Sequence, residues 1–504
     1  MYNKKEAILK KAKNLSLIYI LLISIFVITM AISYALPNKN IIKNTKESMP
    51  KLLEEGLYPR VFFDSHKSQL DNFTDSWMLN IAISADNKHP LKSSLANPYK
   101  ESQDAKDKIE QLNKSLYEKD LLEGEYSRYW HGYQIILRPL LLIFNYEQIR
   151  YINMFGLMSL FMIVAYLIKK EIGTRYVISF LVSMLMIMFM ISPMSLQFSS
   201  MFYMTFISMI VILIYHKQIK KNNYLIYIFF IIGALTSFVD LLTVPLLTLG
   251  FPLITYILLQ EKNNNLLTNT IETIKSSIIW GIGYGTTWAT KWIIATIVLK
   301  KNVIKNALSQ ILSRTSHEAE NIHLHKIDVI KKNTDLIFDV FIIKLFIIAS
   351  IIWAIGYGTT WATKWIIATI VLKKNIIKNA LSQILSRTSH EAENIHLHKI
   401  DVIKKNTDLI FDVFIIKIFI IALIIWLILF IISKRKNIIN ILPILLISIY
   451  PILWYIVLEN HSYMHFWFTY RSLGVSIFAV TSFMMYSIDI YKLKNKLGGR
   501  RWNI

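Results

Sequence analysis

Long apolar runs separated by short polar stretches make up most of the chain. A bilayer core needs about 20 apolar residues per helix, so runs of this length predict membrane spans. We expect spans near residues 15–36, 148–168, 176–193, 200–215, 224–240, 241–259, 275–299, 339–353, 354–373, 412–433, 437–458 and 470–490. The predicted fold class is an all-α, polytopic transmembrane helical bundle of about 10–12 spans.

The composition supports this interpretation and excludes other classes of protein. Of the 504 residues, 54% are apolar and only 18% are charged, which leaves too little polar surface to coat a soluble protein of this size. The chain contains no cysteine, which excludes a disulfide-stapled scaffold. Intrinsic disorder and a collagen-like fibre are excluded by the same composition.

One large polar segment, residues 37–147, interrupts the apolar pattern after the first span. It predicts an extracytoplasmic loop, with a surface helix over Ser102–Leu122 and a helix lying flat on the membrane near 129–144. The expected organisation places a basic N-terminus and first span in 1–36 and this loop in 37–147. A transmembrane bundle in 148–299, C-terminal spans in 427–490 and a basic tail in 491–504 complete it.

The net charge of +23 is distributed in a way that indicates membrane topology. Residues 37–147 contain 15 Lys/Arg and 16 Asp/Glu, so the excess of positive charge lies elsewhere, in short stretches beside apolar runs. Basic stretches of this kind hold loops on the cytoplasmic side, and they predict that both termini are cytoplasmic. No basic face interleaved with aromatic residues is present, so we expect no nucleic-acid partner.

Residues 281–353 recur almost unchanged as residues 354–426, a tandem repeat with a period of 73. The four differences are Gly281/Ala354, Val303/Ile376, Leu345/Ile418 and Ser350/Leu423. Two copies are too few for a solenoid, so we interpret the repeat as a recent duplication. Either copy could occupy the original position. A turn at Gly356-Tyr357-Gly358 would make the added segment a hairpin and preserve the downstream topology.

Three carboxylates and one histidine lie close together in the polar segment. Asp64, His66, Asp71 and Asp75 fall within 12 positions. A carboxylate whose pKa is tuned by partial burial can take a proton from a hydroxyl group, which suggests catalysis. The alternative is a solvated loop whose aspartates cap helices, and Asp75 is then a plausible N-cap.

Ionisable residues at membrane depth are costly, so Asp240 and Lys291 are further candidates. Asp240 lies between two spans, and Lys291 has its duplicate at Lys364. A lysine that reaches the membrane surface between two tryptophans is the alternative for Lys291. His131, in an aromatic cluster beside Gly132, is also a candidate.

The loop before the last span contains His461 and His465, which share one helical face, and is followed by Arg471. Two histidines at this spacing suit a metal or an anionic group, but no third ligand is near and we predict no metal site. The guanidinium of Arg471 suits a phosphate. An aromatic belt with an anchoring arginine is the alternative.

The layout as a whole resembles the GT-C class of integral-membrane glycosyltransferases, in particular uncharacterised bacterial members. One N-terminal span precedes a large external loop with acidic residues, followed by a flat helix ending in Arg138-Pro139-Leu140-Leu141-Leu142. Tyr146-Glu147-Gln148-Ile149-Arg150 then leads into the second span. The likeness covers nearly the whole chain except the extra 73 residues.

The resemblance implies a multi-pass protein of a bacterial cell membrane. It would transfer a sugar from a polyprenyl-phosphate donor to a glycan, lipid or polymer acceptor on the external face, with no further cofactor. It maps the general base to Asp75 or Asp71, and the donor-phosphate site to Arg138 and Arg471 with His461 and His465 nearby. The acidic pair that usually follows the first span is replaced here by Pro37-Asn38-Lys39-Asn40.

Two other functions fit the same sequence features. A transporter or flippase of a lipid-linked or small anionic substrate would have repeats of whole bundles and Gly/Pro-broken helices at the midplane. A non-catalytic scaffold for surface-polymer assembly would tolerate substitution of the carboxylates. An acyltransferase is a further alternative.

Overall fold

The computed structural model describes residues 2–61, 65–260, 264–316, 318–319, 322–323, 325–336, 391–392, 395–396 and 424–496. These residues are mostly helical, with three short antiparallel strand pairs, so the predicted all-α class is confirmed. The chain divides into two units, Met1–Ile337 with Lys436–Ser487 and Phe338–Arg435 with Ile488–Ile504. We describe each unit separately.

Four helical stretches among the described residues are long and apolar enough to cross a membrane: Leu9–Ala35, Tyr146–Glu171, Leu196–Lys221 and Ile438–Val457. Four apolar helices are shorter: Thr174–Met186, Leu225–Val239, Leu246–Leu259 and Ile424–Ser433. By their length and composition these helices are compatible with a membrane protein. The count of about 10–12 spans stays a prediction.

Several predicted spans are shorter in the structure because the backbone breaks inside the apolar runs. Helix α7 (Tyr146–Glu171) begins at a capping box between Asn145 and Gln148, and α8 (Thr174–Met186) follows Gly173, whose φ is 126°. The run expected to continue α8 to residue 193 instead forms a 3-10 helix, Phe189–Met194, which contains Pro193. The spans predicted at 224–240 and 241–259 form two separate helices, α10 (Leu225–Val239) and α11 (Leu246–Leu259), and the second begins later than predicted.

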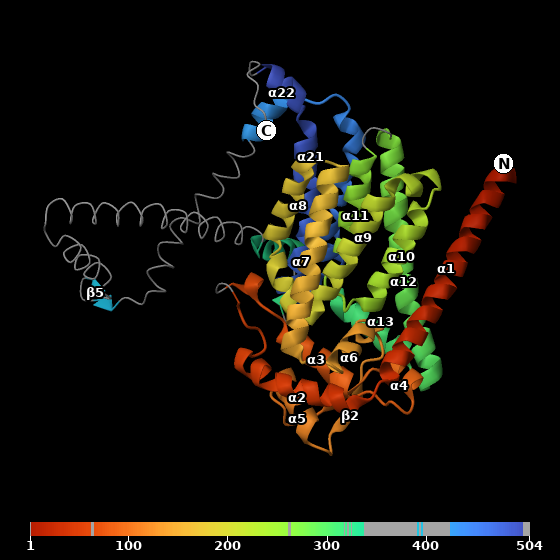
Figure 1. Ribbon diagram of the computed structural model, residues 1–504, viewed down its shortest axis with the longest axis vertical. Coiled ribbons are helices and arrows are strands. Elements are labelled where there is room, and N and C mark those ends of the chain that lie inside the picture. Colours follow the sequence, from red (N-terminus) through yellow and green to blue (C-terminus); the bar gives the residue numbers. More distant parts are fainter. Residues whose placement is uncertain are drawn as a thin grey trace. The chain divides into compact units, whose positions relative to one another are not determined.

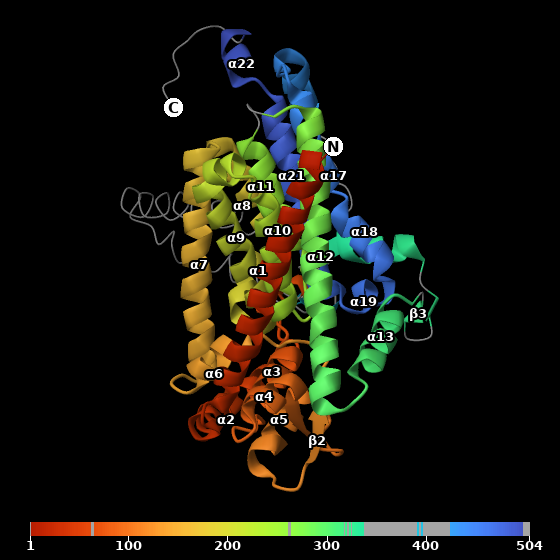
Figure 2. The same ribbon diagram turned by 90° about the vertical axis from the view of Figure 1, so that its right-hand side faces the viewer.

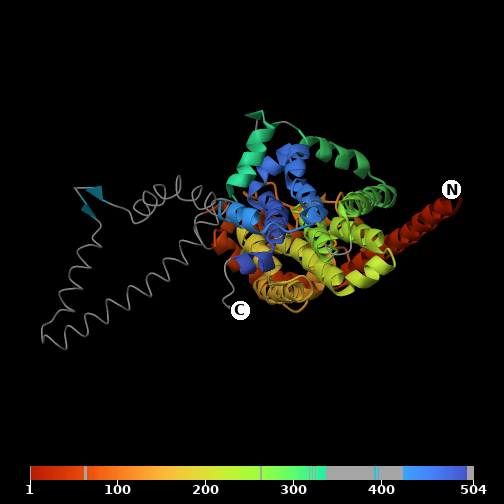
Figure 3. The same cartoon turned by 90° about the horizontal axis from the view of Figure 1, so that it is seen from above.

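The bundle of the first unit consists of helices that run side by side (Figures 1 and 3). They are α7, α8, α9 (Leu196–Lys221), α10, α11, α12 (Leu266–Leu299) and α21 (Leu473–Ser487). Helices α10 and α12 approach each other closely at Gly283. A Cβ atom at this position would collide with the carbonyl oxygen of Phe230. Helix α1 (Tyr2–Ala35) lies beside α12 (Figure 2), where Tyr19 Oη contacts Thr290 Oγ1. The exposed face of α1 is apolar, as expected for contact with lipid.

The segment after the first span folds at one end of the bundle (Figure 1). Its elements are α2 (Asn38–Glu55), α3 (Asn72–Ile83), α4 (Pro90–Ala96), β1 (Pro98–Glu101), α5 (Lys108–Tyr117), β2 (Leu122–Glu125) and α6 (Gln134–Leu141). Strands β1 and β2 pair antiparallel, with Pro98 opposite Glu125. The helix expected over Ser102–Leu122 is therefore shorter, because β2 begins at its end and Asp107 caps α5.

The rest of the first unit follows α12. Helix α13 (Val303–Arg314) leads to a strand pair, β3 (Glu318–Ala319) and β4 (Ile322–His323). The C-terminal elements are η3 (Ile438–Ile441), α17 (Pro443–Ile447), α18 (Tyr450–Val457), α19 (Glu459–Met464), α20 (Phe466–Thr469) and η4 (Tyr470–Ser472), which precede α21.

Indole groups attach residues 37–147, which we call the outer segment, to α12 of the bundle. Trp288 Nε1 and Trp292 Nε1 both donate to the carbonyl oxygen of Arg128, at 3.0 and 2.9 Å. Trp130 Nε1 donates in the other direction, to Thr287 O at 2.8 Å. Residues of the first repeat copy thus hold the outer segment in place.

The second unit contributes few described residues. Its helix over residues 424–433 is joined to α22 (Ile490–Lys496) by a backbone bridge between Lys434 and Ile488. Strands β5 (Glu391–Ala392) and β6 (Ile395–His396) lie 73 positions after β3 and β4, so both copies form the same short hairpin. The predicted turn at residues 356–358 lies outside the described residues.

Candidate functional site

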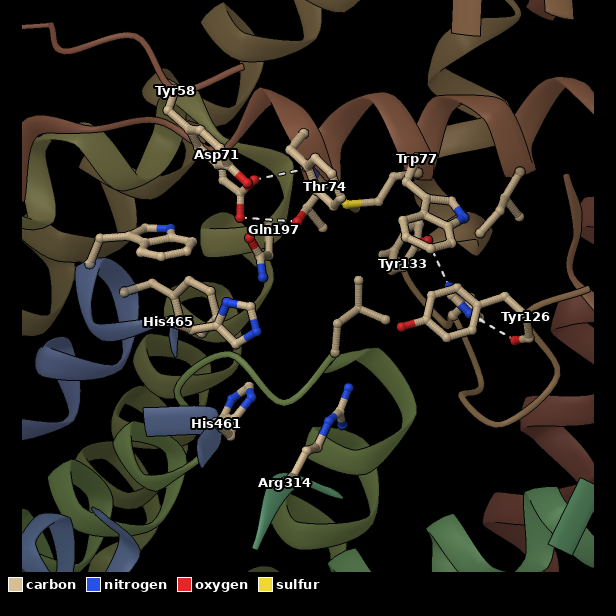
Figure 4. A pocket seen from close by; sticks show the side chains of 17 residues that line it. Tyr58, Asp71, Thr74, Trp77, Tyr126, Tyr133, Gln197, Arg314, His461 and His465 are labelled. Carbon is tan, nitrogen blue, oxygen red and sulfur yellow. Dashed lines mark hydrogen bonds between the residues drawn. The ribbon is translucent and has the colours of Figure 1, made fainter. Parts of the chain in front are cut away.

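A cavity of about 250 Å³ lies in the first unit between the outer segment and the end of the bundle. Its lining comes from α3, from the loop before α6, from the start of α9 (Leu196–Lys221), from α13 and from the C-terminal elements α19 and α20. Figure 4 shows Asp71 on one side and His461, His465 and Arg314 on the other. Segments far apart in sequence therefore bring acid, imidazole and guanidinium groups together.

Asp71 is the buried carboxyl group of this cavity. It caps α3, because its Oδ1 accepts from Thr74 N at 2.9 Å and its Oδ2 accepts from Thr74 Oγ1 at 3.0 Å. Burial raises the pKa of Asp71 to about 7, outweighing the two hydrogen bonds from Thr74, which lower it. A carboxyl group with this pKa can both accept and release a proton near neutral pH.

His461 and His465 lie side by side on the opposite wall, with ring centroids 4.9 Å apart and ring planes tilted by 59°. Burial lowers the pKa of both, to about 4 for His465, so both imidazoles are neutral at pH 7. His461 Nε2 lies 2.8 Å from the carbonyl oxygen of Leu242 and must donate to it. Its Nδ1 is therefore an acceptor, and within the described part of the chain it has no partner.

Arg314, the last residue of α13, supplies the cation of the cavity. Its Nη1 donates to Tyr129 Oη, and its guanidinium lies 5.6 Å from the centroid of the Tyr129 ring. The side chain points into the cavity (Figure 4). A guanidinium fork can bind two oxygen atoms of one phosphate at once, which a lysine cannot do.

The lining contains several buried polar atoms that have no hydrogen-bond partner among the described residues. They are Trp77 Nε1, Gln197 Oε1, His461 Nδ1, His465 Nδ1 and Trp467 Nε1. Leaving a buried donor or acceptor unpaired costs about 1–3 kcal/mol, so several in one cavity are unusual in a packed core. A polar ligand with both donors and acceptors would satisfy them.

Asp75 has a structural role. Its predicted role as an N-cap of α3 is wrong, and its contacts argue against a role as the general base. The N-cap is Asp71, and Asp75 lies within the first turn. Its carboxylate accepts from Ser195 Oγ at 3.2 Å, Leu196 N at 2.9 Å and Gln197 N at 3.1 Å, and also from Tyr146 Oη. It thus caps α9 and does not line the cavity.

Arg138 is likewise taken up by the fold, which removes it from the predicted phosphate site. It is fully buried, and its guanidinium donates to backbone carbonyls and one amide. The acceptors are Ser33 O at 2.9 Å, Leu36 O at 2.9 Å, Asn38 Oδ1 at 2.9 Å and Ala82 O. A buried fork with four protein acceptors has no free edge for a phosphate.

Arg471 is also fully buried and does not line the cavity. Its Nη1 donates to Trp467 O at 2.8 Å, and its guanidinium lies 4.3 Å from the Phe198 ring centroid. Its positive charge slightly lowers the pKa of Asp71. Arg471 therefore acts on the site through Asp71.

The remaining candidates have separate positions. His131 lines the cavity, but Tyr133 Oη and Tyr126 O occupy its two nitrogens at 2.8 and 3.1 Å. Lys291 is fully buried and donates to Leu95 O at 2.8 Å, so its ammonium group is paired within the protein and not exposed. Asp240 accepts from Thr243 N at 2.8 Å and lies outside the cavity lining. Asp64 lies outside the described residues.

The sequence interpretation missed Arg314, Gln197 and the tyrosines of the cavity. Arg314 lies in the polar loop of the first repeat copy, which contains none of the predicted site residues. The signal was available, because Arg314 is the only arginine of its copy in a chain that otherwise favours lysine.

The arrangement can hold an anion at Arg314 and move a proton at Asp71 in the same cavity. No family model, curated protein or solved structure matches this chain. The chemical interpretation therefore rests on the site itself.

Proposed function

We propose that the chain is a membrane glycosyltransferase of GT-C type, which moves a sugar from a polyprenyl-phosphate donor to an acceptor on the external face of a bacterial membrane. The observation that carries the proposal is the cavity in which Asp71 faces Arg314 across a lining of unpaired polar atoms. Both termini would be cytoplasmic, which places this cavity outside.

The lipid carrier fits the position of the cavity at the end of a bundle of apolar helices. A polyprenyl chain would remain among the helices while its phosphate meets a cation at the membrane boundary. Arg314 would hold that phosphate, in the role that the resemblance assigned to Arg138 and Arg471.

The proposed reaction uses groups that already face one another. An acceptor hydroxyl loses its proton to the Asp71 carboxylate as its oxygen bonds to the anomeric carbon. The bond from that carbon to the phosphate oxygen breaks, and its electron pair leaves with the polyprenyl phosphate, whose charge Arg314 stabilises. An anion in the cavity would also favour the protonated form of His461, which converts Nδ1 into a donor.

The test is sugar transfer by the full chain in proteoliposomes, supplied with polyprenyl-phosphate hexoses and a membrane-derived glycan fraction. We expect Asp71→Asn to lower the transfer rate by about 10²-fold or more, the usual contribution of a general base. Asn also caps helices, so the fold is preserved and folded protein serves as the control. Full activity of Asp71→Asn would refute the proposal. Movement of intact lipid-linked sugar without cleavage would assign the protein to transport instead.

A further inference from the structure

A second cavity, of about 460 Å³, lies beside the first on the outer segment. It is lined by residues 101–103 and 105–108, by Gln111 of α5 and by Leu122 of β2. Phe73 of α3 lines both cavities, so the two spaces meet at this side chain. The second cavity contains none of the groups assigned to the proposed reaction.

A row of aromatic rings extends from the first cavity through Phe73, which lines both cavities, to Tyr99 of β1. Starting from Trp467, ring centroids are 5.6 Å apart to Tyr58 and a further 6.2 Å to Phe73. From Phe73 the row continues to Trp77 at 6.1 Å and then to Tyr99 at 5.5 Å. Tyr58, Phe73, Trp77 and Tyr99 are only partly buried, so they keep ring surface for a ligand.

The row is fixed in place from the side of the second cavity. Lys108 Nζ lies 4.3 Å from the Trp77 ring centroid and donates to Gln111 Oε1 at 2.7 Å. On β2, residue 124 is glycine opposite Tyr99, and a Cβ there would collide with the Tyr99 ring. The rings are therefore held in their positions before any ligand arrives.

The lining of the second cavity indicates the charge of its ligand. Its two acidic residues, Glu101 and Asp107, are balanced by Lys106 and Lys108, and Ser102, Gln103 and Gln111 add neutral polar groups. A strongly charged polymer gains little from such a surface. A chain of pyranose units presents hydroxyl groups to polar side chains and flat C–H faces to aromatic rings, and so matches both features.

We propose that the aromatic row and the second cavity bind a neutral oligosaccharide, one end of which reaches the first cavity. Taking this oligosaccharide to be the acceptor rests on the proposed function. The binding itself does not depend on any transfer reaction.

The test measures binding of the purified full chain to cellulose and chitin oligomers of one to six units. We expect affinity to rise at least tenfold between one unit and four. Ala105→Trp fills the second cavity, and it should reduce the affinity for the four-unit oligomer to that for the single sugar. Tyr117→Ala, which removes an exposed aromatic residue at the far end of α5, is the matched control and should bind as the unaltered protein does.

The proposal is overturned if affinity does not rise with oligomer length. It is also overturned if Ala105→Trp binds the four-unit oligomer unchanged, or if poly(glycerol phosphate) binds more tightly than any neutral oligomer. Length-dependent binding together with an absence of sugar transfer would contradict the proposed function alone.

Discussion

Asp71, the N-cap of α3, and Asp75, one helical turn later, belong to two regions that differ in how completely their polar groups are paired. Asp75 belongs to a buried group with Glu55, Asn72, Tyr146 and Arg150, which we call the Asp75 cluster. In that cluster Arg150 donates to Glu55 Oε2 at 2.8 Å and to Asn72 Oδ1 at 2.7 Å, and Asp75 accepts from four donors. Asp71 faces a cavity whose polar atoms have few partners among the described residues.

The difference separates structural from functional polar groups. Charged groups that are paired with other groups of the protein hold helices together. Unpaired polar atoms around a cavity are instead available to bind a ligand. Burial alone does not distinguish them, since Asp71 and Asp75 are both almost completely buried. The number of hydrogen-bond partners within the protein distinguishes them.

The largest effect on stability should come from breaking the Asp75 cluster. Asp75→Asn replaces one carboxylate oxygen by an NH2 group, which then faces several hydrogen-bond donors. Losing one partner of a buried charged group lowers the free energy of unfolding by about 3–5 kcal/mol. Unfolding of the detergent-solubilised chain would measure this loss. Asp71→Asn, the matched variant one turn earlier, should show no comparable loss at pH 7. Equal destabilisation by both changes would erase the distinction.

A second prediction compares two arginines. Arg138→Gln should lower the free energy of unfolding by about 2–3 kcal/mol, because several buried carbonyls lose their donor. Arg314→Gln should leave stability nearly unchanged and weaken binding of polyprenyl phosphate by about tenfold or more, because charge-assisted hydrogen bonds are lost. Unfolding and binding measured on the same preparations would show whether the two effects separate. A large stability loss in Arg314→Gln would place it with the structural group.

Asp71 and His465, on the two walls of the cavity, should make the stability of the protein depend on pH in opposite directions. The pKa of Asp71 is about 7 against an ordinary 3.8, so the folded chain binds more protons and stability falls as pH rises through this window. The pKa of His465 is about 4 against an ordinary 6.5, so the unfolded chain binds more protons and stability falls as pH drops through that window.

Substitutions at the two walls should therefore change the pH profile in opposite directions. The stability of Asp71→Asn relative to the unaltered protein should increase towards pH 7, and that of His465→Asn should increase towards pH 4. Each change should be on the order of a few kcal/mol. Unfolding measured between pH 4 and 8 would test this, and parallel profiles would contradict it.

The smallest effect is expected from removing residues 354–426. Both the Asp75 cluster and the cavity are built from residues outside this copy, and Arg314 belongs to the first copy. Stability of the first unit and binding in the cavity should stay within about 0.5 kcal/mol of the full chain. Loss of binding in the shortened chain would show that the second copy contributes to the site.

The sequence predicted the helical class and four of the residues that line the cavity: Asp71, His131, His461 and His465. Local patterns could not distinguish Asp71 from Asp75, because the donors that occupy Asp75 come from the start of α9, some 120 positions later. For the same reason Arg138 was assigned to the phosphate site and Arg314 was missed. An arginine's role depends on which acceptors surround it, and distant segments supply those acceptors.

The origin of Arg314 in a repeated stretch has a genetic consequence. A direct repeat within a gene can lose one copy by recombination, and a period of 73 residues is a whole number of codons, so the reading frame survives. Whether Arg314 or Arg387 remains, an arginine stands at the same place in the same sequence, and Gly281 and Val303, two of the four positions where the copies differ, do not line the cavity. We expect long and short alleles of this gene to coexist among close relatives, and their proteins to be interchangeable.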